Sequence, residues 1–150
     1  MRIPIQVLVY PVRKANDNWE YLMLKRVKSL GGFWQGVTGA LRGKENLVQA
    51  ANRLFFKETG YIPNVLIQTD LSFKIPMKDG WNENCPVGTK EIPEYLFIAK
   101  IDLKSLPKID LNQHTEWKWC SFEEAMDLLY WENNKVALEY VKRFLDKDRE

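Results

Sequence analysis

Several residue types that mark specialised proteins are scarce in this sequence. Only two cysteines occur, Cys85 and Cys120, and their spacing is not that of a metal site, so we expect free thiols in a reducing compartment. The apolar start of the chain, residues 3–12, is too short and too interrupted by Pro and Gln for a membrane span or a signal peptide. The net charge is only +2, which argues against a dedicated nucleic-acid binder. We therefore expect a soluble, cytoplasmic protein that acts on neither nucleic acid nor membranes.

The length and the apolar fraction are those of one ordinary folded domain. The chain has 150 residues, of which 45% are hydrophobic and 28% are charged, and this is enough to build a substantial core. No internal repeat or low-complexity stretch occurs. We expect a single domain over residues 1–150, present as a monomer or a homodimer.

Strand and helix patterns together predict an α+β fold. β-Branched and aromatic residues predict a hairpin whose strands, Ile3–Tyr10 and Trp19–Arg26, flank the turn Asn16–Asn18. Apolar residues at three- and four-residue steps predict a helix over about Asn46–Thr59, ended by Gly60. The other expected elements are strands within 33–35, 65–75, 93–103 and 114–119, a helix capped by Ser121 and Glu124, and an amphipathic helix over 134–147. Their order predicts a mixed sheet between helices.

The stretch 39–61 carries a recognisable spacing of glycines, acids and an arginine. It reads GALRGKENLVQAANRLFFKETGY and resembles the Nudix signature G-x5-E-x7-R-E-U-x-E-E-x-G-U, in which U is a bulky aliphatic residue. The matching positions are Gly39, Glu45, Arg53, Phe55, Glu58 and Gly60, with an aromatic Tyr61 in the last U slot. The resemblance covers nearly the whole chain and implies an α/β/α sandwich with Mg²⁺-dependent hydrolysis of a nucleotide-type diphosphate linkage.

Two departures from this signature remove negative charge. Leu54 and Lys57 stand where the pattern has glutamates, so the box is degenerate. Positions 54, 57 and 58 share one helix face, and in active relatives three carboxylates there hold Mg²⁺, which prefers oxygen ligands. One carboxylate beside an ammonium group is a poor magnesium site. By resemblance, Glu58 and the carbonyl of Gly39 are the remaining metal ligands.

Arg53 and Glu45 are the other candidates for the catalytic machinery, because in the family this pair braces a loop against the helix. Arg53 and Lys57 lie four residues apart, so their like charges are unfavourable unless something offsets them. Either Glu45 and Glu58 neutralise them, or an anion such as a polyphosphate is held there by cations instead of by a metal. In the second case Lys57 acts as a point charge.

Further substrate-binding candidates lie before and after the box. Arg26 ends a strand whose basic residue faces phosphates in the family, although a solvated strand end is an equally good interpretation. Trp34 and Gln35 precede the signature glycine, and Trp34 is alternatively a core residue. Trp81 lies in the long loop 76–92, where it either stacks on a purine or pterin ring or anchors the loop.

The segment 114–119, HTEWKW, resembles a second family segment of the type E-H-x-E-x-x-W. A late glutamate from this region often serves as a metal ligand or general base in the family, but this chain has Gln113 at that position. An amide can orient a water but cannot accept a proton at neutral pH. Glu116 is a substitute carboxylate or an ordinary exposed residue, and His114 contacts substrate or packs in the core.

The details of the resemblance indicate a branch and a substrate class. Val37-Thr38-Gly39 and the tail 116–145 resemble dihydroneopterin triphosphate pyrophosphatases and related dATP pyrophosphohydrolases. We therefore expect a hydrolase that releases pyrophosphate from a nucleoside or pterin triphosphate, weakened by Leu54 and Lys57, with Mg²⁺ implied as cofactor by the family. The alternative is a non-catalytic nucleotide- or polyphosphate-binding Nudix domain.

Overall fold

The computed structural model describes residues 2–77, 90–102 and 104–147. The elements in order are β1 (Arg2–Ala15), β2 (Asn18–Arg26), a short 3-10 turn (Lys28–Leu30), β3 (Trp34–Gln35), β4 (Val37–Arg42), α1 (Leu47–Thr59), β5 (Val65–Pro76), β6 (Glu91–Lys100), β7 (His114–Cys120), α2 (Phe122–Leu128) and α3 (Glu132–Lys147). Trp81 and Cys85 lie outside the described residues.

The sheet is mixed and is organised around β1. β1 runs parallel to β6 and antiparallel to β2 and β4, and the strand order is β3-β2-β1-β6-β5, with β4 on β1 and β7 on β2. Along one edge, β1 pairs with β4 up to Val9 and with β2 from Val12 onward. β4 therefore pairs with the first part of this edge of β1, and β2 pairs with the last part.

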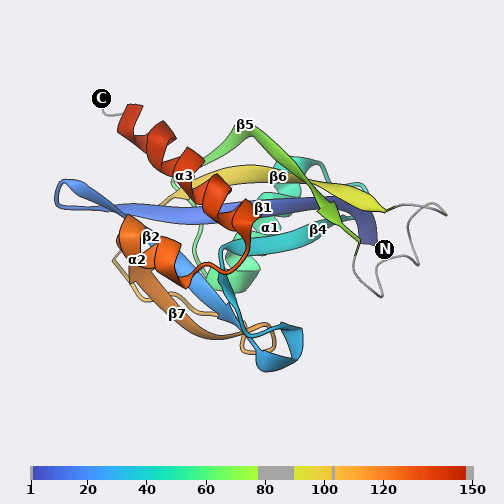
Figure 1. Cartoon of the computed structure of the whole chain (residues 1–150), viewed down its shortest axis with the longest axis horizontal. Helices are drawn as coiled ribbons and strands as arrows, with labels where there is room; N and C mark the ends of the chain where they lie inside the picture. The colour runs from blue at the N-terminus through green and yellow to red at the C-terminus, as the bar shows by residue number, and fades with distance from the viewer. Residues whose placement is uncertain (1, 78–89, 103, 148–150) are drawn as a thin grey trace.

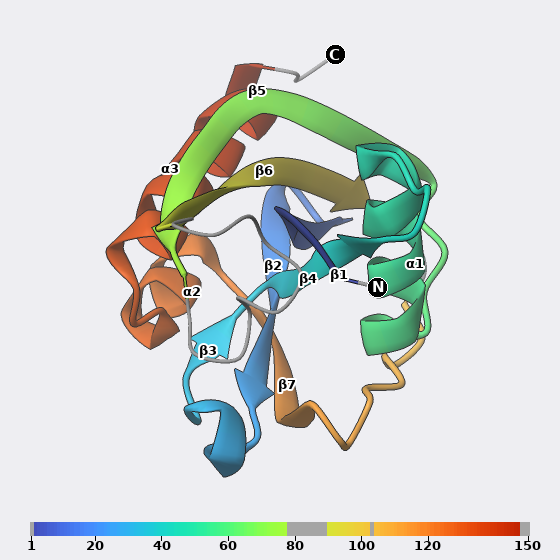
Figure 2. The same cartoon turned by 90° about the vertical axis from the view of Figure 1, so that its right-hand side faces the viewer.

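Helix α1 lies on one face of this sheet, and helices α2 and α3 lie on the other (Figures 1 and 2). An apolar layer separates the sheet from the helices on each face. Successive side chains of a strand point to opposite faces, so Val7 and Val9 pack toward α1, whereas Leu8, Tyr10 and Val12 pack toward α2 and α3. The prediction of an α+β fold with a mixed sheet between helices is confirmed.

The helix that carries the box begins and ends where local chemistry predicts. Asn46 caps α1 by accepting from the Gln49 amide, while the Gln49 side chain accepts from the Asn46 amide. Gly60 ends the helix with φ of 75°, a left-handed conformation that glycine adopts without strain. The second capping box, Ser121 with Glu124 on α2, is also present.

Some element boundaries differ from the sequence-based expectation. The hairpin strands reach Ala15 and begin at Asn18, because cross-strand pairs continue almost to the turn. β6 begins earlier and ends at Lys100. Cys120 is a free, buried thiol, and burial raises its pKa to about 11. None of the described helices combines the length and the apolar character needed to cross a bilayer.

Candidate functional site

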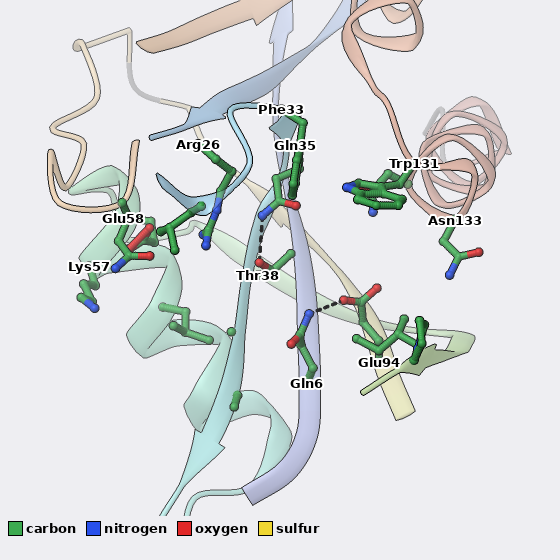
Figure 3. Close-up of a pocket in the computed structure, with 18 of the residues that line it drawn as sticks. Gln6, Arg26, Phe33, Gln35, Thr38, Lys57, Glu58, Glu94, Trp131 and Asn133 are labelled. Atoms are coloured by element: carbon green, nitrogen blue, oxygen red, sulfur yellow. Dashed lines mark hydrogen bonds between the residues drawn. The ribbon is translucent and has the colours of Figure 1, made fainter. Parts of the chain in front are cut away.

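A cavity of about 770 Å³ opens between α1, the N-terminal half of β1 and the start of α3 (Figure 3). Its α1 end is defined by Arg26, Lys57 and Glu58, and its α3 end by Gln6, Glu94, Trp131, Asn133 and Asn134. Phe33, Gln35 and Thr38 lie between the two ends. The volume is within the range of pockets that hold small ligands.

The loop before α1 is fixed to the helix by Glu45 and Arg53. Arg53 Nε donates to Glu45 Oε2 at 2.6 Å, and Arg53 Nη2 donates to Glu45 Oε1 at 3.0 Å and to the Ala40 carbonyl at 2.9 Å. Glu45 Oε1 also accepts from the Arg42 amide at 2.8 Å. These bonds, that of Arg53 first, lower the pKa of Glu45 below its ordinary value. The predicted contact is confirmed, and its role is to hold the loop in place.

Leu54 fills the space beside the signature glycine. A Cβ atom added at Gly39 would lie 2.6 Å from both methyl carbons of Leu54, so the two residues are in direct contact. The side chain of Leu54 is only 7% exposed and belongs to the core layer under α1. Hydrocarbon therefore lies against Gly39 at the helix position where the resemblance implies a carboxylate ligand.

Glu58 is buried against β7 and does not stand free in the pocket. Its Oε2 lies 3.0 Å from His114 Nδ1, and both side chains are almost inaccessible. The contact is an ion-pair distance without hydrogen-bond alignment, because neither ring nitrogen of His114 has a hydrogen-bond partner among the described residues. Glu58 thus links the end of α1 to the first residue of β7.

Arg26 is a charged neighbour of Glu58. Burial lowers the pKa of the Arg26 guanidinium from its ordinary value, and the charge of Glu58 acts in the opposite direction. Arg26 lines the cavity, and its Nε is buried without a hydrogen-bond partner in the described part of the chain. A buried donor without a partner is costly, so an anion in the cavity would stabilise it.

Lys57 is the exposed cation of the α1 end. Its side chain is 44% exposed, and Nζ lies 3.9 Å from Asp110 Oδ2. We considered that Glu45 and Glu58 neutralise Arg53 and Lys57. The structure confirms the pairing of Arg53 with Glu45. The partner of Lys57 is Asp110 from a distant loop, whereas Glu58 is engaged by His114.

The residues at this site do not fit a resident Mg²⁺ ion. Mg²⁺ requires oxygen ligands in near-octahedral geometry, and the helix face presents a hydrocarbon, an ammonium group and one carboxylate that already faces His114. Within residues 2–77, 90–102 and 104–147, no group of three or more His, Cys, Asp or Glu side chains could hold a metal.

The remaining predicted substrate residues are divided by the fold. Gln35 and Gln113 line the cavity, and Gln35 Nε2 donates to Thr38 Oγ1 at 2.9 Å. Trp34, His114 and Glu116 are not among the described lining residues. Trp34 packs on the core layer of α2 and α3, and Glu116 is exposed 3.4 Å from Lys25. Their roles toward substrate stay predictions.

The α3 end was missed by the sequence reasoning. Gln6 Nε2 donates to Glu94 Oε2 at 2.6 Å, and both side chains are over nine-tenths buried. Trp131 meets Phe33 edge-on, with ring centroids 5.5 Å apart. A signal was present, because Gln6 and Glu94 are lone polar residues inside otherwise apolar strands, and such residues are buried only when paired.

Comparison with solved structures shows the same fold in several hydrolases. A candidate NUDIX hydrolase from Listeria monocytogenes is 28% identical, with a TM-score of 0.83 and 97% of each chain covered. An Ap4A hydrolase from Caenorhabditis elegans in a binary complex is 19% identical, with a TM-score of 0.77 over 97% of this chain and 99% of that chain. The Escherichia coli dihydroneopterin triphosphate pyrophosphohydrolase is 22% identical, with a TM-score of 0.75 over 93% and 94%.

A search of curated protein sequences found no match. The sequence profile of the NUDIX domain, in contrast, matches residues 3–144, which is nearly the whole chain. This match confirms the resemblance of residues 39–61, and it agrees with the sandwich of helices around a mixed sheet. The chain therefore belongs to the NUDIX domain family, the family of the Nudix hydrolases.

Proposed function

We propose that this Nudix-type hydrolase binds the phosphate chain of a nucleoside or pterin triphosphate at the α1 end of its cavity. We propose further that it cleaves the diphosphate linkage slowly, releasing pyrophosphate. The observation that carries the proposal is the pair of cations at this end. Arg26 has a buried Nε without a hydrogen-bond partner in the part of the chain that the structure describes, and Lys57 has a partly exposed ammonium group. Relatives of the same fold support the ligand class, since they include an Ap4A hydrolase and a Nudix domain complexed with ADP ribose.

The chain's own side chains account for binding better than for rapid turnover. Arg26 and Lys57 offer N–H donors and positive charge to the phosphate oxygens. Hydrolysis adds water across the linkage: a new P–O bond forms to water, the bridging P–O bond breaks, pyrophosphate leaves, and the proton of the attacking water passes to the solvent. The Gln113 amide can orient that water, but it cannot take the proton, and Glu58 is held by His114. Slow cleavage follows.

Members of the family generally use a divalent metal such as Mg²⁺. In this chain the donor set argues for a different arrangement, in which cations take the place of the ion as the partner of the phosphates. Lys57 stands at a position where the signature has a carboxylate, so the charge at that position is positive instead of negative. A positive group there binds a phosphate, whereas the carboxylate of the signature binds a metal ion. The bound polyphosphate then needs no metal to be held.

A non-catalytic binding domain is the second candidate. It is favoured by the contact of Leu54 with Gly39, because this contact occupies the place of a metal ligand without disturbing the rest of the cavity. Binding and cleavage are therefore tested separately.

Binding is tested by calorimetric titration of a non-hydrolysable nucleoside triphosphate, in excess chelator and again in excess Mg²⁺. We expect similar Kd values in the two buffers. Complete loss of binding in chelator would rule out the cation-held mode. The variant Arg26→Gln should weaken binding in both buffers, whereas Arg143→Gln, on an exposed position of α3, serves as the matched control.

Cleavage is tested by a pyrophosphate-release assay on purine, pyrimidine and pterin triphosphates with Mg²⁺ and Mn²⁺. Slow release that requires Arg26 supports the hydrolase, and binding without any release supports the second candidate. We also propose that residues 1–150 are a single domain, a monomer or homodimer of the cytoplasm, without nucleic-acid or membrane partners.

A further inference from the structure

The α3 end of the cavity has a chemistry opposite to that of the α1 end. Its polar lining includes the carboxylate of Glu94, which is 4% exposed, and the side chain of Asn134, which is 6% exposed. Asn134 Oδ1 is buried and has no hydrogen-bond partner among the described residues. The oxygen atoms of Glu94 and Asn134 therefore give this end acceptors, and a ligand edge with N–H donors complements them.

The position of this acceptor cluster is fixed by the surrounding strands. Gln6 on β1 donates to Glu94 on β6 across the parallel pair Gln6↔Glu94. Tyr10 on the same β1 strand donates its hydroxyl to the backbone carbonyl of Asn134 at 2.8 Å. The charge of Glu94 also contributes, after burial, to raising the pKa of Tyr10. Tyr10 therefore holds the start of α3 against β1, the strand whose Gln6 also pairs with Glu94.

An aromatic wall stands beside these acceptors. Trp131, immediately before α3, lines the cavity and is 45% exposed, and it meets Phe33 with an interplanar angle of 89°. Figure 3 shows Trp131 and Asn133 on the same side of the cavity as Glu94, with Arg26 and Glu58 across from them. A planar ring that stacks on Trp131 would leave its polar edge for the acceptors and its substituent for the cations.

We propose that the α3 end is a ring-recognition subsite in which Glu94, oriented by Gln6, accepts two adjacent N–H donors of a 2-amino-4-oxo heterocycle stacked on Trp131. Guanine and pterin both carry this edge: a ring N–H beside an exocyclic amino group. A carboxylate accepts such a pair in a bidentate contact. Adenine and hypoxanthine lack the pair, so the subsite discriminates against them. The inference rests on the proposed function, because the α1 end must hold the phosphates of the same ligand.

The test is a set of Kd values measured in chelator for GTP, ITP, ATP, dihydroneopterin triphosphate and tripolyphosphate. ITP is GTP without the 2-amino group, and tripolyphosphate has no ring. We expect GTP or dihydroneopterin triphosphate to bind about tenfold or more tightly than ITP and ATP, the usual scale of a hydrogen bond to a charged group. The Kd values of GTP and dihydroneopterin triphosphate, compared with each other, identify whether guanine or pterin is the preferred ring.

The variant Glu94→Gln keeps the side-chain shape and removes the charge. We expect it to bring the ratio of the ITP and GTP Kd values close to unity while leaving tripolyphosphate binding unchanged. Glu91→Gln, on an exposed position of the same strand, is the matched control and should retain the ratio. The comparison of GTP with ITP on the unmodified protein needs no variant, so it stands even if Glu94→Gln fails to fold.

The outcomes separate this inference from the proposed function. Equal binding of all ring-bearing triphosphates, or a preference for GTP that survives Glu94→Gln, overturns the ring-recognition subsite and leaves phosphate binding intact. Failure of all five ligands to bind, tripolyphosphate included, overturns the proposed function and the subsite with it. A preference that is lost only in Glu94→Gln supports both.

Discussion

Two sets of positions in and before helix α1 follow the Nudix signature to different degrees: the bracing pair Glu45–Arg53, and positions 54, 57 and 58. On its loop side, Arg53 and Glu45 make a bidentate contact and reach the backbone of Ala40 and Arg42, as a bracing pair should. In its last turns, Leu54 covers Gly39, and Glu58 is drawn to His114. The same helix thus keeps the contacts that brace the site, whereas the side chains at positions 54 and 57 differ from those of the signature.

This difference shows that the bracing contacts of the fold can be present without the carboxylates that hold a metal ion. The brace depends on contacts among the end of strand β4, the loop that follows it and helix α1, and none of these contacts involves positions 54, 57 or 58. Apolar packing at Leu54 even adds to the core layer under α1. The brace is therefore kept in a chain that lacks the signature's glutamates at positions 54 and 57.

The largest effect should come from restoring carboxylates to the last turns of α1. We expect Leu54→Glu combined with Lys57→Glu to raise metal-dependent pyrophosphate release by about a hundredfold, the scale of one electrostatic contribution to catalysis. Release is measured with Mg²⁺ and Mn²⁺ across a triphosphate panel.

The matched control is Leu54→Gln with Lys57→Gln, which makes the same positions polar without adding negative charge. It should stay as slow as the unmodified protein. If the unmodified protein is already fast and the double glutamate variant is no faster, the cation-held mode is wrong.

A smaller effect, on stability, should follow from breaking the brace. Arg53→Ala leaves Glu45 without its main partner and removes a bond to Ala40, so we expect unfolding to become easier by about 2 kcal/mol. Chemical denaturation measures this. Arg143→Ala, on the exposed side of α3, should change the free energy of unfolding little. Equal losses of stability in the two variants would contradict the bracing role of Arg53.

Removing the exposed cation should affect binding alone. We expect Lys57→Gln to weaken triphosphate binding about fivefold, since a partly exposed charge pair is worth about 1 kcal/mol. Lys44→Gln, on the exposed loop before α1, is the control for net charge. Tighter binding by Lys57→Gln would contradict the role of Lys57 as a phosphate ligand.

The smallest effect should be seen in the acid dependence of stability. The folded-state pKa of Glu45 is lowered by its bond from Arg53, so its contribution is present above its ordinary pKa of 4.5 and is lost as pH falls through the lower folded value. The stability difference between the unmodified protein and Glu45→Gln should therefore shrink below about pH 4.5. A stability difference that grows as the pH falls would contradict the lowered pKa of Glu45 in the folded state.

Much of the fold could be predicted because its signals are local. The limits of α1 follow from Asn46 and Gly60, and the Glu45–Arg53 contact follows from the spacing of the signature. The contacts that decide the site are not local. His114 reaches Glu58 from β7, and Asp110 reaches Lys57 from a loop far along the chain, so periodicity could not reveal either pair.

The α3 end escaped prediction for the same physical reason. Gln6, Glu94 and Asn134 come from three elements, and only the parallel pairing of β1 with β6 brings the first two together. Each of them in isolation is one polar residue in an apolar or helical segment. The fold, not the sequence pattern, makes them one surface.

The most direct test of the central claim is a Mn²⁺ titration of the unmodified protein, followed by electron paramagnetic resonance. Mn²⁺ binds the same oxygen ligands as Mg²⁺ and is visible to the method. We expect no site tighter than about 1 mM in the unmodified chain and at least one tighter site in the double glutamate variant. Two tightly held ions against α1 of the unmodified protein would contradict the account.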